Sequence, residues 1–380
     1  MRATNMQTTM AHASPVLAEA DRLMVVCNSC RYCEGLCAVF PAMEMRRIFT
    51  DGDLNYLANL CHGCGACYFD CQFSPPHEFE VNVPRALAQA RLHSYQAYAW
   101  PGFLAGLFSR NGIVVAVIAV VCLLGFVAGF FSYYDPALLS RAVTGPGAFY
   151  AFMPHTVMAS LFGAVFLYAI LAIAISAFRF WRDIGEPAAN LIRPQPVWQA
   201  TKDAATLKYL DGGEGGCGNA DEQPSNNRRL FHHLTFYGFL LCFASTVAAT
   251  LYHYVLGREA PYGWFELPVI LGTLGGLGIV IGPLGLIATR LQRDPALSDP
   301  GSYGMDTTFA LMLVATGFTG LALLALRDTP LMGMLLAVHL GVVMALFLTL
   351  PYGKFIHGIF RYLALARYAR EIKEHQPTAD

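Results

Sequence analysis

Charged residues are scarce in this sequence: Asp, Glu, Lys and Arg together make up 13% of its 380 residues. A soluble domain of ordinary composition carries about 25%. Because hydrophobic residues reach 55% and the charges lie mostly between long apolar blocks, the composition excludes a wholly soluble protein. The formal net charge of −1 provides no attraction to polyanions, so no nucleic-acid partner is expected.

The chain also lacks the motifs that would indicate catalysis by its own side chains. It has no catalytic triad, and the glycines of LDGGEGGCG (210–218) follow no strand and precede no clear helix, as a dinucleotide site would require. We therefore expect the connection 179–231 that contains them to be a flexible loop. The N-terminus lacks the charged-then-apolar pattern of a secretory signal. The part that follows it is accordingly expected in the cytoplasm, where thiols stay reduced.

Six apolar blocks are long enough to cross a bilayer, which takes about 20 residues. They carry charges only near their edges, and they are too long for strands and too apolar on every face for surface helices. The alternative, buried helices of a soluble protein, fits these lengths less well. We predict a mainly α protein with a small domain over 1–100 and a six-helix transmembrane bundle over 101–380, with spans near 113–134, 156–178, 234–256, 267–289, 307–326 and 331–353.

The distribution of Lys and Arg predicts the orientation of this bundle. Of 25 basic residues, 22 precede the first span, follow the last, or lie in the connections 179–231 and 290–303. The alternating connections hold one each: Arg141, Arg258 and Arg327. Because positively charged segments stay on the cytoplasmic side, we expect a multi-pass protein of the cell inner membrane with both termini and the N-terminal domain in the cytoplasm.

Cysteine is abundant, and eight of the eleven cysteines fall within residues 27–71 in one repeated spacing. Three cysteines at x2 intervals can converge from one loop onto three corners of an iron–sulfur cubane, and in two-cluster ferredoxins the fourth cysteine serves the other cluster. This predicts a two-cluster ferredoxin-type domain with two [4Fe–4S] clusters. One would be held by Cys27, Cys30, Cys33 and Cys71, and the other by Cys61, Cys64, Cys67 and Cys37.

Two other interpretations of these cysteines fit less well. Structural zinc favours paired CxxC knuckles over triplets with a distant fourth cysteine, and disulfides do not suit the cytoplasm. The sequence does depart from the usual pattern, because Ala38 and Gln72 follow the fourth cysteines where proline is common. The remaining cysteines, Cys122, Cys217 and Cys242, are interpreted as small apolar side chains or a plain surface thiol.

Histidines near the ends of the apolar blocks are candidate ligands of b-type haem, because ionisable residues within a bilayer are rare and usually functional. His339 and His357 are 18 residues apart, which on one helix would place them on one face roughly 27 Å apart. We predict one or two bis-histidine haems, with His232 or His233 opposite His357, and His253 opposite His339 or its substitute His155. The alternative is that these histidines only anchor helix ends. The candidate ligands are His155, His232, His233, His253, His339 and His357.

The sequence resembles the tricarballylate/citrate utilization protein B family. The resemblance lies in the repeated cysteine motif, RRLFHHLTFYGFLLCFAST (228–246), LYHY (251–254) and LTLPYGKFIHGIFRY (348–362). The membrane part is also similar in layout to the di-haem gamma subunit of respiratory nitrate reductase. The resemblance implies a membrane electron-transfer subunit, rather than a stand-alone enzyme, that reoxidises the flavin of a partner FAD-dependent dehydrogenase acting on tricarballylate. Electrons would pass through the clusters and haem to membrane quinone.

Two other functions use the same parts. The chain could be a quinol-oxidising subunit of a complex that resembles heterodisulfide or sulfite reductases. It could also be a membrane redox sensor without turnover. The direction of electron flow between donor and quinone separates the first alternative from the main hypothesis, and any flow at all excludes the second.

Overall fold

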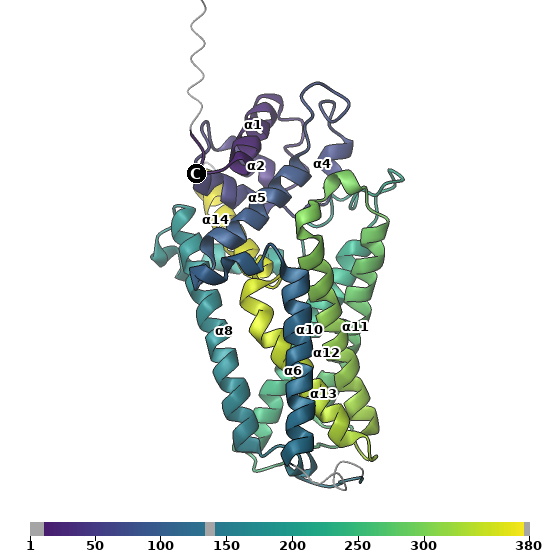
Figure 1. Cartoon of the computed structure of the whole chain (residues 1–380). Helices are drawn as coiled ribbons and strands as arrows, with labels where there is room; N and C mark the ends of the chain where they lie inside the picture. Colours follow the sequence, from purple (N-terminus) through teal and green to yellow (C-terminus); the bar gives the residue numbers. More distant parts are fainter. Residues whose placement is uncertain (1–10, 134–140, 376–380) are drawn as a thin grey trace, which may run out of the picture.

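The computed structural model describes residues 11–133 and 141–375, and within these ranges the chain is helical with no strand. Figure 1 shows long helices side by side in a bundle, with the shorter N-terminal helices gathered at one end of it. This confirms the predicted mainly α fold with a small domain and a six-helix bundle. Position 134, the predicted end of the first span, lies outside the described residues, as does Arg2.

Six helices are long and apolar enough to cross a membrane. In five of them, only 11–33% of the most apolar stretch of the helix is buried, so most of that stretch faces outward. In the last helix, 56% of this stretch is buried. That last helix therefore forms much of the bundle's interior. The six are α6 (Asn111–Tyr133), α8 (His155–Asp183), α10 (Asn227–Tyr254), α11 (Leu267–Leu291), α12 (Tyr303–Leu326) and α13 (Met332–Thr349).

Glycines let α10 and α11 approach almost backbone to backbone. A Cβ added at Gly238 of α10 would lie 2.8 Å from the backbone of Gly278 on α11. A Cβ at Gly282 would lie 2.6 Å from the backbone nitrogen of Thr235. Small residues at such crossings are typical of helix pairs in membranes, where close packing replaces the hydrophobic driving force.

The N-terminal domain is built from short helices whose ends are set by capping side chains. Ser14 and Asn82 accept hydrogen bonds at the starts of the first and last of them, and Thr50 and Asp53 form a capping box at the start of the third. The helices are α1 (Pro15–Cys30), α2 (Val39–Glu44), α3 (Asp51–Leu60), α4 (Ala66–Phe69) and α5 (Val83–Tyr98).

The α-helix is interrupted after α13 instead of continuing as one helix. A 3-10 turn (Leu350–Tyr352) and the extended Gly353 separate α13 from α14 (Ile356–His375). Pro351 in this turn has no backbone N–H to continue the helix ladder. The expectation that His339 and His357 face the same way on one straight helix is therefore wrong.

Helix α14 runs back along the N-terminal domain and joins it through a mostly buried ion network. Arg367 of α14 lies 2.8 Å from Glu371 and 3.0 Å from Asp53 of α3. Arg46, between α2 and α3, bonds both Asp53, at 2.8 Å, and Glu371. Because these groups come from both ends of the chain, the network fixes the N-terminal domain on the C-terminal helix that continues from the bundle.

Candidate functional site

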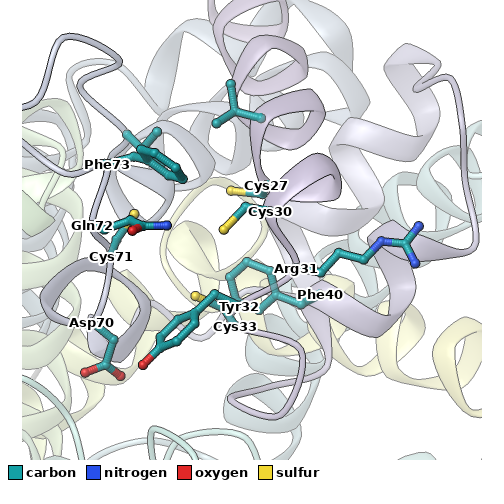
Figure 2. A pocket seen from close by; sticks show the side chains of 12 residues that line it. Cys27, Cys30, Arg31, Tyr32, Cys33, Phe40, Asp70, Cys71, Gln72 and Phe73 are labelled. Atoms are coloured by element: carbon teal, nitrogen blue, oxygen red, sulfur yellow. The ribbon is translucent and has the colours of Figure 1, made fainter.

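Four cysteines from two separate loops surround a cavity of about 220 Å³ in the N-terminal domain. Cys27 and Cys30 lie on the last turn of α1, and Arg31 then takes a left-handed conformation (φ 58°) that ends the helix and turns the chain toward Cys33. Cys71 reaches the same cavity from the end of α4 (Figure 2). We call this group, Cys27, Cys30, Cys33 and Cys71, the outer site, because Cys30 is exposed.

The other four cysteines form a second group, the inner site: Cys37, Cys61, Cys64 and Cys67. Burial raises the pKa of the Cys37 thiol well above its ordinary value, and the charges of Cys64 and Cys61 add to this. Burial likewise raises the pKa of Cys67, with further increases from Cys64 and Cys37. Each motif thus places its fourth cysteine beside the first three of the other motif, which is the crossed arrangement that the spacing predicts.

The arrangement of the four thiols around the outer cavity favours a polynuclear group over a single metal ion. Across residues 11–133 and 141–375, no three His, Cys, Asp or Glu side chains gather closely enough to hold a single metal ion. Zinc with bonds of about 2.3 Å to sulfur would require such a gathering. Four thiols around a cavity fit a larger polynuclear group, so the residues present suit an iron–sulfur cubane.

The inner site is covered by the glycine-rich segment 210–218. The Gly218 nitrogen donates to the Cys64 carbonyl at 3.0 Å, and a side chain at Gly218 would collide with the ring of Phe69. Cys217 is only 3% exposed and packs in one small apolar cluster with Cys64. The expected flexible loop is therefore wrong at this segment, because its small residues let the backbone lie directly on the cysteine loops. Of the two interpretations of Cys217, the small apolar side chain is the one that the structure supports.

The histidines near the inner site form one close pair. The rings of His232 on α10 and His357 on α14 have centroids 6.1 Å apart, at 70°. With metal–nitrogen bonds of about 2 Å, two imidazoles on opposite sides of one iron have ring centroids roughly 6 Å apart, so this pair fits a bis-histidine haem. Burial, reinforced by the charge of Lys354, keeps the pKa of His357 well below its ordinary value, so this ring is neutral. His233 lies beside Tyr237 instead.

The remaining histidines do not form the second predicted pair. His253, in the last turn of α10, stacks on His155 at the start of α8, with ring centroids 3.6 Å apart and planes at 20°. Face-to-face rings this close leave no room for a metal between their nitrogens. His339 bonds Thr319 of α12 at 2.9 Å. The neighbour of His253 is therefore the substitute, His155, and not His339.

Comparisons with known proteins agree with this architecture. Residues 109–380 match the family described as citrate utilization protein B. The chain belongs to this family. Residues 20–97, which include both cysteine motifs, match the Fer4-like domain of the same family, a kind of domain that binds iron–sulfur clusters. A citrate utilization protein B from Escherichia coli is 50% identical over 362 residues, covering 93% of this chain and 92% of that protein. No solved structure matches.

Four arginines near the inner site were missed by the sequence analysis: Arg91, Arg228, Arg293 and Arg361. They come from three helices and one connection, so their convergence depends on the tertiary fold. Two of them carried a local signal, because Arg228 precedes His232 by four residues and Arg361 follows His357 by four. Residues four apart share one face of a helix.

Proposed function

We propose that this chain transfers electrons between a reduced flavoprotein and membrane quinone. The outer and inner sites would each hold a [4Fe–4S] cluster, and His232 and His357 would hold a b haem. When bound, these groups accept and release one electron at a time. The observation that carries the proposal is the position of the inner site, which lies between the exposed outer site and the histidine pair at the end of the membrane helices.

The protein's own residues connect the inner site to the two helices that carry the histidine pair. Arg228 on α10 donates to the carbonyls of Gly63 at 2.7 Å and His62 at 3.2 Å, within the inner cysteine loop. One turn further along the same helix is His232. On α14, Arg361 donates to the Cys61 carbonyl at 2.9 Å, and His357 lies one turn before it. Both haem-ligand candidates are thus attached to the inner site by arginines on their own helices.

The name of the Escherichia coli relative supports a choice of partner. That protein is named for citrate utilization, and a small tricarboxylate is oxidised by removing two hydrogens, which is the chemistry of a flavin. We therefore propose that the electron donor is an FAD-dependent dehydrogenase acting on tricarballylate or a similar tricarboxylate. It would dock at the outer site, on the side where the basic connections place the cytoplasm.

The test uses the purified chain in vesicles that contain a quinone, under anaerobic conditions. A flavoprotein tricarballylate dehydrogenase with its substrate serves as donor, and quinone reduction is followed optically. We expect quinone reduction that requires the chain and falls at least tenfold with Cys64→Ala. Electron flow only from added quinol to the oxidised flavoprotein would support the quinol-oxidising alternative and contradict the proposal.

A further inference from the structure

Four guanidinium groups converge on one short segment of the inner cysteine loop, residues 58–63. Arg91 donates to the carbonyls of Ala58 at 2.8 Å and Cys61 at 2.7 Å. Arg361 also donates to Cys61, at 2.9 Å. Both Arg228 and Arg293 donate to Gly63 at 2.7 Å. We call Arg91, Arg228, Arg293 and Arg361 the arginine collar.

The collar has no carboxylate partner within the described part of the chain. The neighbouring network around Arg46 and Arg367, by contrast, pairs each guanidinium with Asp53 and Glu371. Burial lowers the pKa of Arg293 to about 10, with repulsion from Arg228. The Nε of Arg293 is buried with no hydrogen-bond partner.

All four collar arginines are partly buried, and partly buried charges of one sign are costly unless an opposite charge compensates them. Among the groups that act most strongly on Arg293 are the thiols of Cys217, Cys64 and Cys61. A cubane held by four thiolates carries net negative charge, and reduction makes it more negative. The positive charge of the collar would therefore stabilise the reduced form of a cluster in the inner site.

Among the described residues, no buried arginine lines the cavity of the outer site. Asp70 lines this cavity, but it is exposed, so water screens its charge. Arg31 also lines the cavity, but its exposed guanidinium bonds Asn28 and extends away from the sulfurs (Figure 2). Exposed charges are screened by water, so this arginine compensates little.

We infer that the arginine collar gives the inner site the higher reduction potential of the two, so that electrons enter at the outer site and leave from the inner site toward His232 and His357. Net charge, hydrogen bonding and solvent exposure are the properties that set such potentials. In each transfer the outer cluster loses one electron and the inner cluster gains it. The inference rests on the proposed function, because it requires clusters in both sites.

The experiment is a potentiometric titration of the purified chain followed by EPR, with the midpoint of each cluster as the readout. Cys30→Ser, which changes an exposed outer ligand, identifies the outer signal. In Arg293→Gln we expect the inner midpoint to fall by at least 59 mV, the equivalent of tenfold for a one-electron couple, with the outer midpoint unchanged. Arg293→Lys keeps the charge, so its inner midpoint should lie close to that of the unmodified chain.

The matched control is Arg290→Gln. Arg290 lies three residues away, but it stacks on the Tyr303 ring at 4.1 Å and bonds Thr307 at 3.1 Å, and it donates to no carbonyl of the segment 58–63. Equal shifts in Arg290→Gln and Arg293→Gln, no shift in either, or a higher midpoint at the outer site would overturn the inference.

If Arg293→Gln loses iron, Arg228→Gln compared with Arg229→Gln decides the same question. Arg229 binds Asp211 and Thr206, outside the collar.

These outcomes remain distinct from failure of the proposed function. A chain without iron or acid-labile sulfide contradicts the function itself, because no cluster is then present. If both clusters are present but their midpoints do not change in the collar variants, only the inference is contradicted. A collar with a purely structural role would change the amount of iron bound but leave the potentials of the remaining clusters where they are.

Discussion

His232 and His357 show how much of this account depends on the placement of single side chains. They are 125 residues apart in the sequence, yet their rings, on α10 and α14, lie edge to face with centroids 6.1 Å apart. The sequence could predict that histidines at helix ends matter, but it left His232 and His233 as alternatives. The structure separates the two because adjacent residues on a helix point about 100° apart, and only His232 lies beside His357.

This separation leads to a prediction for haem binding. His232→Ala and His357→Ala each remove one of two proposed ligands, so we expect the haem b content of the purified chain to fall by more than half. His233→Ala, one position away, should retain it. Haem content is measured by optical difference spectra at equal protein concentration. Retention of full haem by His357→Ala, or equal loss in His233→Ala, would remove this pair as the ligands.

At the scale of helices, the sequence predicted what depends on local composition. Six apolar blocks of about 20 residues predict six spans because that length matches the bilayer, and all six are present. The course of α14 was not predicted, because its path across the N-terminal domain depends on partners such as Asp53 that are more than 300 residues away. The glycine-rich segment 210–218 was misinterpreted for a similar reason, since its contacts with Cys64 and Phe69 are tertiary.

The contact between α3 and α14 gives a prediction of pH-dependent stability. Burial raises the pKa of Asp53, but hydrogen bonds from Arg46 and Thr50 and the charges of Arg46 and Arg367 outweigh burial and leave it below its ordinary value. A lowered folded-state pKa stabilises the fold above the unfolded value of about 3.9. This contribution is therefore complete near neutral pH and is lost as the pH falls below about 4, through the folded pKa.

Asp53→Asn should lower the free energy of unfolding at pH 7 by roughly 3 kcal/mol, because it leaves two largely buried arginines short of a partner. Thermal unfolding in detergent at pH 7 and at lower pH measures this, and the variant should lose part of the pH dependence of the unmodified chain. Glu19→Gln breaks only an exposed pair with Arg22 and should cost less than about 1 kcal/mol. Equal destabilisation by the two variants would contradict the role given to the network.

At the scale of the whole molecule, a cysteine-rich domain is fixed to one end of a membrane bundle by the collar, the ion network and the segment 210–218 (Figure 1). Cysteine spacing predicted the two groups of thiols because each triplet is a local motif. The difference between the sites could not be predicted, because exposure and the arginine collar arise only when helices from the whole chain meet. In the proposed function, this asymmetry would separate an exposed entry for electrons from a buried exit toward the membrane.

The most direct test of the account is the iron and acid-labile sulfide content of the anaerobically purified chain, measured together with its EPR spectrum after reduction. We predict about eight iron atoms and eight sulfides per chain with the signals of two interacting clusters, and about half of each in Cys64→Ala, because two cubanes hold four irons apiece. About two zinc ions per chain with no iron or sulfide would contradict the central claim that these eight cysteines hold two iron–sulfur clusters.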